Sequence, residues 1–536
     1  MLKIKKNIFF LFITFISAIT ADAQMWSSET LEDVVDPELQ RTFIIIDSEH
    51  DYDLNPHTAS YNSEAQVLSG LYEGLFSYHP VTLEPVNAIC SSYKVSRDKK
   101  RWTFTLKQDV KFSNGDPITA YTFKDSWQSL LSNPNAGFAS LLDCIQGAQA
   151  FRKGEITFDK VGINARDETT LVVTLQTPAE HLPKILCHHA FSAVSSKDNV
   201  YSGPFVLKSY DKTTLEMVKN TQYRDAENVH LPGIKIIQSS DYDENTALYN
   251  NGEADWITGG ASISKILNAS SIHIAAEFGT QYLFFKTKNK PWNNRKFREA
   301  LLEAIPYDEL RANYYVPAET FVYPLSGYPD VNGINDYDTD YAKDLMKEAR
   351  MEEGIPLDEK LTITFAIVDV EYLKKWALLL KNAWEPLGVE LKVETTSADS
   401  YNAAIPYWKA DLYEYSWIGD FADPLAFLEL FRSKSSLNVA EYNNEEFDSL
   451  LAKSAVADST SEHDKILAQA EQILLDDCMV IPVSHPVSLH FIDTEAVGGW
   501  QTNALDLHPL KYLYLKKKLI NIPNLVMLEH PQCSAL

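Results

Sequence analysis

Cysteine is scarce in this sequence, which has only five in 536 residues. No two of them form a C-x-x-C pair, so a structural zinc site built on cysteine is not expected. One or two disulfides stay open for an exported chain, because the wide spacings do not pair the cysteines. For each of them a small buried thiol is the favoured interpretation. The five are Cys90, Cys144, Cys187, Cys478 and Cys533.

Motifs of common hydrolases and nucleotide-binding proteins are also missing. The chain has no G-x-S-x-G, no H-E-x-x-H and no Walker phosphate loop. Asp420 and Asp423 stand close enough in sequence to suggest the carboxylate pair of a glycosidase. With 74 acidic residues, however, such pairs arise by chance. We therefore expect a protein that is not an enzyme and that uses no cofactor and no metal.

Basic residues are few relative to acidic ones. The chain has 48 Lys and Arg against 74 Asp and Glu, a formal net charge of -26. That excess repels phosphate backbones, so nucleic-acid binding is not expected. It favours solubility and, more weakly, cationic or zwitterionic ligands. A hydrophobic share of 45% indicates a folded protein, and the length indicates two or more lobes.

Long hydrophobic runs are confined to the start of the chain. Lys3, Lys5 and Lys6 precede an almost wholly apolar run over residues 8–19, which is too short for a comfortable membrane span. The small-x-small sequence of residues 21–23 then matches a signal-peptidase site. We expect residues 1–23 to be a cleaved secretory signal. No cysteine stands at the expected cleavage point, so a lipid anchor is not indicated.

The stretch Trp417–Pro424 combines a tryptophan, a glycine and two acids, closed by Asp-Pro. This pattern predicts a strand that runs into a turn and holds a carboxylate beside an aromatic wall. Such a carboxylate could receive a cationic amine of a ligand. The alternative is a core tryptophan followed by an aspartate that caps the next helix.

Strand and helix patterns alternate along the chain, which predicts an α/β architecture. Residues with period-two alternation, typical of strands, occur at 101–106, 361–365 and 389–393. Apolar residues at helical spacing occur at 372–384, 445–453 and 462–475.

Several motifs, in a consistent order from about residue 42 to about residue 517, resemble the peptide-binding proteins of bacterial ABC importers. This family is the large periplasmic oligopeptide and dipeptide class. The block from Trp102 to Trp127 is the most specific of the motifs. The motifs are Leu71-Tyr72-Glu73-Gly74-Leu75, residues 102–107, 110–120 and 126–127, Ser202-Gly203-Pro204-Phe205, Asn220-Thr221-Gln222-Tyr223, Gly252-Glu253-Ala254-Asp255, residues 293–300, Trp417–Pro424 and Ile481-Pro482-Val483.

The resemblance implies a two-lobed periplasmic binding protein fold with an extra subdomain in the first lobe. Phe284, Phe285 and Lys286 would carry the chain from the first lobe to the second. The implied division is lobe one over 24–283 with a subdomain over about 67–195, lobe two over 284–491, a return to lobe one over 492–517 and a C-terminal tail over 518–536.

The resemblance also assigns ligand contacts. Asp420 would pair with the α-amine of a peptide, and the backbone of Trp417 and Gly419 would pair with the peptide as an added strand. Tyr61 and Asn62 fall where the opposite lobe supplies backbone contacts. An ordinary surface turn is the alternative for these two residues.

Two residues depart from the family pattern. Glu414 stands where a basic residue often helps to neutralise the ligand's carboxylate, and Tyr372 stands where a histidine can occur. Recognition of the peptide's C-terminus therefore does not carry over, and the site would favour longer, basic or modified peptides. The alternative for Glu414 is a side chain that points away into solvent.

The function implied is a periplasmic, monomeric solute-binding protein that captures a peptide and delivers it to an inner-membrane ABC permease. No cofactor is implied. Two other functions stay open. One is binding of a non-peptide solute such as a metal chelate, haem or a glycan on the same fold, and the other, less favoured, is hydrolysis.

Overall fold

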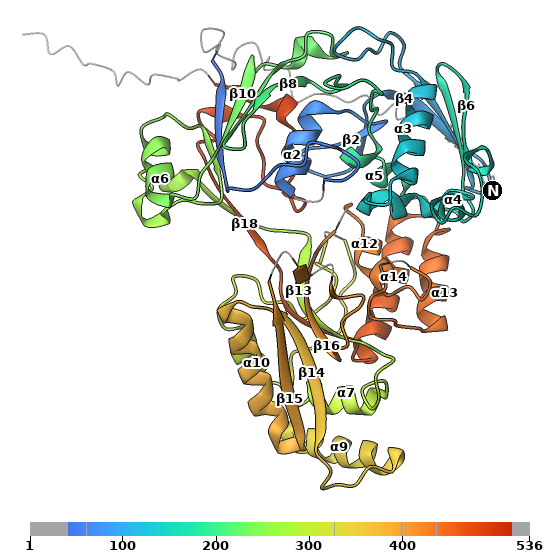
Figure 1. Ribbon diagram of the computed structural model, residues 1–536, viewed down its shortest axis with the longest axis vertical. Helices are drawn as coiled ribbons and strands as arrows, with labels where there is room; N and C mark the ends of the chain where they lie inside the picture. Colours follow the sequence, from blue (N-terminus) through green and yellow to red (C-terminus); the bar gives the residue numbers. More distant parts are fainter. Residues whose placement is uncertain are drawn as a thin grey trace, which may run out of the picture.

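The computed structural model describes residues 41–59, 62–325, 327–397, 400–401, 404–419, 421–435 and 437–516. Within them the protein forms two lobes, each built around its own β-sheet (Figure 1). The larger sheet belongs to the first lobe. Its strands in spatial order are β12 (Ile272–Ala276), β18 (Val487–Ile492), β11 (Trp256–Thr258), β1 (Phe43–Asp47), β10 (Gly233–Gln238), β9 (Thr214–Lys219) and β8 (Phe205–Tyr210).

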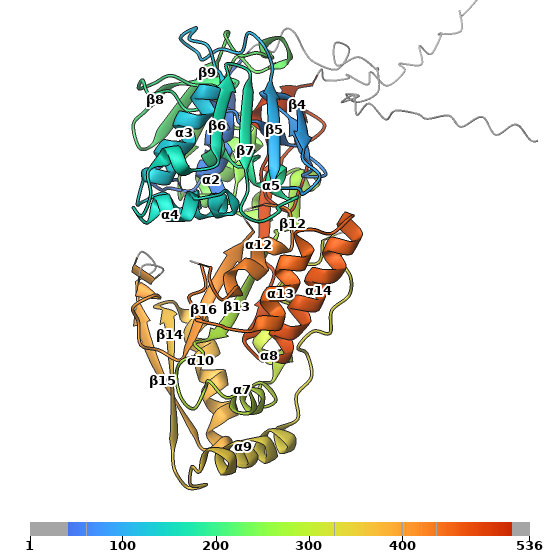
Figure 2. The same ribbon diagram turned by 90° about the vertical axis from the view of Figure 1, so that its right-hand side faces the viewer.

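A smaller sheet forms a subdomain of the first lobe. Trp102, Phe104 and Leu106 of its strand β5 are buried while the residues between them are more exposed, which confirms the half-buried strand predicted there. Helix α3 (Ala120–Ser132) packs on β6 and β7 (Figure 2). The four strands in spatial order are β4 (Cys90–Val95), β5 (Arg101–Leu106), β7 (Thr170–Thr174) and β6 (Ile163–Asp167), and a separate hairpin joins β2 (Phe76–Tyr78) to β3 (Pro85–Asn87).

The second lobe is built on a mixed sheet. Strand β14 pairs in parallel with β15 and with β16, whereas β13 pairs in antiparallel with β16 and β17. The predicted strands at 361–365 and 389–393 are confirmed within β14 and β15. The order is β15 (Val389–Thr396), β14 (Leu361–Val368), β16 (Leu412–Ile418), β13 (Gly279–Phe285) and β17 (Val480–Ser484).

Helices cover both lobes, and those predicted at 372–384, 445–453 and 462–475 are confirmed as α10, α13 and α14. The first lobe carries α2 (Asn62–Leu71), α3 (Ala120–Ser132), α4 (Ala148–Arg152), α5 (Leu182–Ile185) and α6 (Tyr242–Asn250). The second carries α7 (Arg295–Leu302), α8 (Tyr307–Arg311), α9 (Thr339–Glu353), α10 (Glu371–Trp384), α12 (Leu425–Leu428), α13 (Glu445–Ser454) and α14 (Thr460–Asp476).

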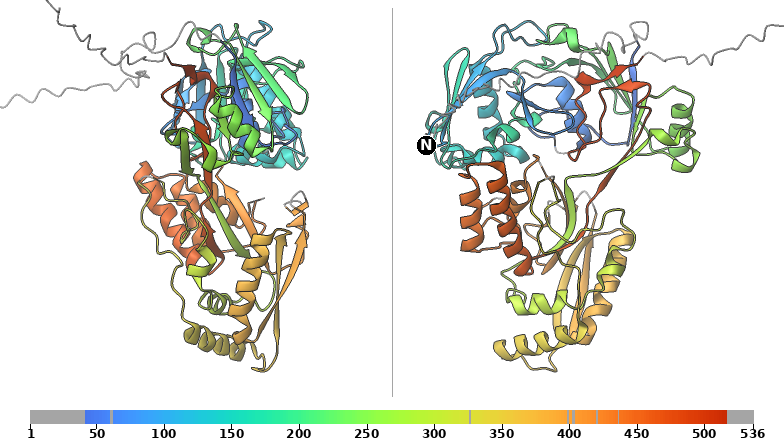
Figure 3. Two further views of the ribbon diagram at one scale, coloured as in Figure 1. Left: turned by 90° about the vertical axis from the view of Figure 1, so that its left-hand side faces the viewer. Right: turned by 180° about the vertical axis from the view of Figure 1, so that it is seen from behind.

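The chain crosses between the lobes earlier than expected. Strand β12 ends at Ala276 in the first sheet and β13 begins at Gly279 in the second; β17 ends at Ser484 and β18 begins at Val487 back in the first. The crossing expected at 284–286 and the return expected at 492 are therefore corrected. The reason is that the apolar end of β13 is buried in the middle of the second sheet. Figure 3 shows the crossing segments from two further sides.

The lobes also touch beside the Trp417–Pro424 stretch. Lys184 of the first lobe places its Nζ 3.3 Å from Asp423 Oδ2 and donates to the Ala422 carbonyl at 3.0 Å. Asp423 Oδ1 accepts from His463 Nε2 and from the Leu425 amide, both at 3.0 Å. Asp423 is therefore a turn residue just before Pro424, which is the N-cap of α12, and it is also part of a contact between the lobes.

Charge pairing dominates the titration of this contact. Burial raises the pKa of the Asp423 carboxyl, but the hydrogen bond from His463 and the nearby Lys184 outweigh burial and hold that pKa well below its usual range. Burial lowers the pKa of His463, but its hydrogen bond to Asp423 outweighs burial and raises that pKa to about 9. An ionised Asp423 thus lies between two cations at neutral pH.

The predictions for the cysteines and for the two ends of the chain fall only partly within the residues that the structure describes. The four cysteines within them, Cys90, Cys144, Cys187 and Cys478, are free thiols. Cys533, the expected signal over 1–23 and the expected tail over 518–536 lie outside the described residues. Within the described part of the chain, none of the helices combines the length and apolar character needed to cross a membrane.

Replacing Glu73 with alanine should destabilise the first lobe by about 3–5 kcal/mol, because it leaves the largely buried guanidinium of Arg224 without its carboxylate partner. Glu73 is buried and accepts from Arg224 at 2.6 and 2.8 Å and from Tyr223, with Lys511 Nζ at 3.6 Å. Urea unfolding followed by tryptophan fluorescence measures the loss. Glu227→Ala, at an exposed position, is the control and should stay within about 0.5 kcal/mol. Equal midpoints for the two variants would contradict the pairing.

Replacing His463 with glutamine should remove a pH-dependent part of the stability. The folded-state pKa of His463 is about 9, above the ordinary 6.5, so its charge stabilises fully below pH 6.5 and this stabilisation is lost as pH rises through 9. The stability difference between parent and variant should shrink by roughly 2 kcal/mol from pH 7 to pH 9.5. Urea unfolding at both pH values checks this.

His230→Gln is the matched control, because burial lowers the pKa of His230 and the imidazole stays neutral over this range. Its stability difference from the parent should not change between the two pH values. A difference for His463→Gln that is equally insensitive to pH would show that its imidazole is uncharged in the folded protein.

Candidate functional site

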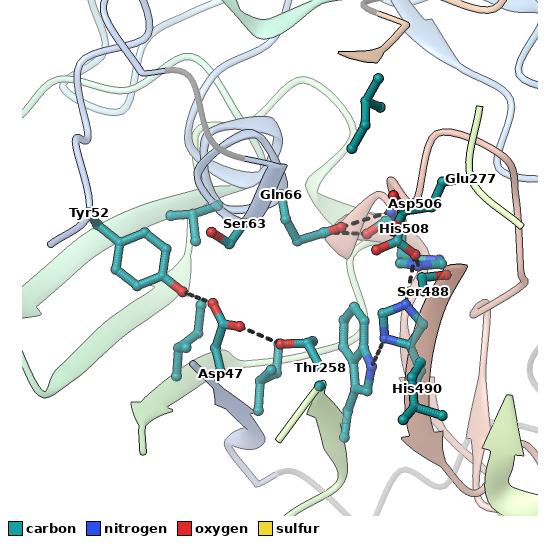
Figure 4. A pocket seen from close by; sticks show the side chains of 17 residues that line it. Asp47, Tyr52, Ser63, Gln66, Thr258, Glu277, Ser488, His490, Asp506 and His508 are labelled. Atoms are coloured by element: carbon teal, nitrogen blue, oxygen red, sulfur yellow. Dashed lines mark hydrogen bonds and ion pairs between the residues drawn. The ribbon is translucent and has the colours of Figure 1, made fainter. Parts of the chain in front are cut away.

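A cavity of about 270 Å³ lies where the two lobes meet. Most of its walls come from the first lobe, but Ile418 at the end of β16 contributes from the second. In Figure 4, Asp47 and Tyr52 lie on one side of it, and Glu277, His490 and Asp506 lie on the other. The cavity therefore reaches the strand that leads into the Trp417–Pro424 stretch.

Strand β16 has one paired edge and one largely open edge. It pairs with β13 from Leu412 to Ile418, but it pairs with β14 only at Leu412 and Tyr413. Where β14 and β16 diverge, the Tyr401 hydroxyl donates to the carbonyls of Ala366 and Glu414, both at 2.8 Å. Beyond that point no described strand pairs with the second edge of β16.

The register decides which residues face the open edge. The Gly419 amide donates to the Phe278 carbonyl at 2.7 Å, on the β13 side. Since main-chain groups alternate along an antiparallel pair, those of Trp417 face β13 as well, and those of Ser416 and Ile418 face the open edge. The Gly419 amide is thus already bound within the protein, and the use of the Gly419 backbone as a ligand contact stays a prediction.

Trp417 and Gly419 hold the strand in place. The Trp417 indole donates from Nε1 to the Ala426 carbonyl at 3.0 Å, which ties β16 to α12. A Cβ atom at Gly419 would lie only 2.5 Å from the Phe278 ring, so a larger residue would push β16 away from the crossing. Both residues position the open edge at Ser416 and Ile418.

Three of the other predicted contact residues lie partly or wholly outside the description. Tyr61 and Asp420 are outside the described residues. Asn62 is the first residue of α2. Ser63, one residue later, lines the cavity, so the start of α2 adjoins the site.

Glu414 and Tyr372 come together through one glutamine. Gln281 Nε2 donates to Glu414 Oε1 at 2.9 Å and to the Tyr372 hydroxyl at 3.2 Å. Glu414 is only 5% exposed, which corrects the alternative that it points into solvent. Burial raises the pKa of its carboxyl to about 7, although the hydrogen bond from Gln281 opposes the shift.

The cavity wall holds a group of buried polar residues that no sequence motif marks. His490, Asp506 and His508 offer ligand atoms within 4.8 Å of one another, as a metal site would require. However, Trp256 Nε1 donates to His490 Nδ1 at 3.2 Å, so the ring proton of neutral His490 is on Nε2 and points to Asp506 Oδ1 at 2.7 Å. These hydrogen bonds therefore account for how close the three residues lie to one another. A metal ion bound to His490 Nε2 would break the hydrogen bond to Asp506.

Glu277 is a second feature that the sequence did not single out. It lies at the crossing between β12 and β13 and lines the cavity. Burial, and then the charge of Asp506, raise the pKa of its carboxyl to about 7. These residues are far apart in sequence, and only the return of the chain through β18 brings them to one wall.

Comparison with known proteins places the chain among binding proteins. The family model for bacterial extracellular solute-binding proteins, family 5, middle, matches residues 84–438. The chain is 26% identical over 491 residues to the dipeptide-binding protein DppE of Bacillus subtilis, covering 86% of this chain and 89% of that protein. It is 28% identical over 497 residues to the periplasmic murein peptide-binding protein MppA of Escherichia coli, covering 87% and 91%.

Solved structures give the same fold. The Escherichia coli murein tripeptide binding protein MppA matches with a TM-score of 0.74 at 24% identity, covering 90% of this chain and 100% of that chain. Haemophilus influenzae OppA in complex with RPPGFSPFR matches with a TM-score of 0.72 at 22% identity, covering 90% and 100%. These matches confirm the two-lobed periplasmic binding protein fold. The chain belongs to the bacterial extracellular solute-binding proteins of family 5.

Proposed function

We propose that the protein captures peptides outside the cytoplasm as a monomer, binds them between its lobes and delivers them to an inner-membrane ABC permease. The open edge of β16 beside the interlobe cavity carries this proposal. Relatives named for dipeptide, murein peptide and oligopeptide binding support it. The expected signal over residues 1–23 supports a periplasmic location.

The open edge suits a peptide because every peptide offers the same main-chain groups. Ser416 and Ile418 direct their amide and carbonyl groups to that edge, and an extended peptide would add there as a strand. Main-chain pairing provides affinity without regard to sequence. The side chains of the peptide would alternate between the cavity and the opposite side.

Asp420 would anchor the α-amine of the peptide. It directly follows Gly419, the first residue after the end of β16, and the Gly419 amide is bound to Phe278 at the crossing between the lobes. Asp423, the other acid of the stretch, is already bound to His463 and Lys184. A peptide held by β16 and by the first-lobe wall would bridge the lobes and favour their closed arrangement.

The function is tested by identifying the ligand that co-purifies with the protein. Mass spectrometry of the released ligand should find peptides, and adding a mixed pool of two- to eight-residue peptides should raise the thermal midpoint. A glycan, haem or metal chelate in the released fraction, with no midpoint shift from any peptide, would overturn the proposal.

Replacing Asp420 with alanine should weaken peptide binding by about 2–5 kcal/mol, because the ammonium group would lose its partner. Isothermal titration calorimetry measures this loss. Acetylating the peptide's amine should cost the parent a similar amount and should cost the variant much less, since both changes remove one interaction. Asp358→Asn, at an exposed position remote from β16, is the charge-matched control and should bind like the parent. Affinity within twofold of the parent for Asp420→Ala would exclude the anchor role.

A further inference from the structure

Glu414 is a buried acid. Within the described part of the chain no lysine, arginine or histidine forms an ion pair with its side chain, and the one hydrogen bond found to its carboxylate comes from Gln281. Between residues 41 and 516, the residues that the structure does not describe are serines, alanines, aspartates, a tyrosine and an asparagine. None of these residue types carries a positive charge. A buried acid of this kind is costly unless something else neutralises it.

The surroundings of Glu414 are held in one arrangement. Ser484 Oγ donates to Gln281 Oε1 at 3.3 Å, which turns the amide nitrogen of Gln281 toward Glu414 and Tyr372. The Tyr401 hydroxyl fixes the Glu414 carbonyl from the open edge. The carboxylate is therefore oriented before any ligand arrives.

Aromatic rings stand beside the acid. The ring centroids of Tyr372 and Tyr314 each lie 5.9 Å from that of Trp376. Burial raises the pKa of both tyrosines, and the charge of Glu414 raises it further. Tyr372 is 46% exposed, so the group reaches the surface. Carboxylates pair with ammonium and guanidinium groups, and aromatic rings near such a cation add to the attraction.

We propose that the Glu414 cluster, formed by Glu414, Gln281, Tyr314 and Tyr372, binds a cationic side chain of the peptide. This inference rests on the proposed function, since it assumes that a peptide lies along β16. Lysine, arginine or another amine-bearing residue has the required charge. The α-carboxylate of a short peptide would be repelled at the same place.

The position of the cation follows from the strand geometry. Glu414 precedes Ile418 by four residues on β16, which corresponds to roughly 13 Å. An extended peptide has the same rise of about 3.3 Å per residue, so its first five residues span the same distance. If its first residue lies near Ile418, the residue that reaches Glu414 is the third, fourth or fifth.

The experiment uses alanine pentapeptides with one lysine at position 2, 3, 4 or 5, each paired with the peptide that has uncharged norleucine at the same position. Calorimetry on the full chain should show lysine preferred at least tenfold at one of positions 3 to 5 and not at position 2. Glu414→Gln should reduce the preference to within twofold. Glu390→Gln, exposed on β15, should keep the preference and controls for net charge.

The preference should also grow with pH, because only the ionised carboxylate attracts lysine. With a pKa of about 7, the ionised fraction of Glu414 rises nearly tenfold between pH 6 and pH 8, and the ratio of lysine to norleucine affinity should rise with it. The other titratable groups facing Glu414 are Tyr282, Tyr314, Tyr372 and Tyr401, whose pKa values are all raised, so they stay neutral. In Glu414→Gln the ratio should not change.

The outcomes separate this inference from the proposed function. Norleucine peptides that bind as well as their lysine partners at every position would overturn the cation site and leave peptide binding intact. A preference that survives in Glu414→Gln would overturn the role of that residue. Failure of every peptide to bind, charged or not, would overturn both.

Discussion

The antiparallel pairing of β13 with β16 is the constraint on which the binding geometry depends. It runs from Phe285 and Leu412 to Gly279 and Ile418 and continues through the hydrogen bond from Gly419 to the Phe278 carbonyl. Because β13 begins at the crossing between the lobes, this register sets the open edge of β16 directly beside the interlobe cavity. A glycine is needed at 419, since the Phe278 ring occupies the space of a side chain.

Two buried acids near this register have opposite environments and therefore opposite uses. Asp423 has His463 and Lys184 beside it, so its pKa falls and its charge links a helix start to the other lobe. Glu414 lies beside an amide and aromatic rings, with no ion pair among the residues that the structure describes, and burial raises its pKa to about 7. The charge of Asp423 is paired within the protein, whereas the charge of Glu414 would be paired by a cationic side chain of the ligand.

Three features of the tertiary structure converge at the interlobe cavity. The open edge of β16 provides main-chain partners, the start of α2 provides part of the first-lobe wall, and the residues around Asp506 close the opposite side. The hydrogen bonds of His490 orient that wall. Main-chain pairing would hold any peptide, and the charge of Glu414 would then select among peptides.

The amino-acid sequence by itself determined the α/β class and the strands and helices with strong periodicity, since these depend on neighbouring residues. It also marked Glu414 and Tyr372 as unusual, without showing that Gln281 joins them. Only the tertiary structure decided where the chain crosses between the lobes, that Ser416 and Ile418 rather than Trp417 and Gly419 face the open edge, and that Glu414 is buried. The physical reason is that strand register and burial depend on contacts between residues more than a hundred positions apart, which local sequence patterns do not contain.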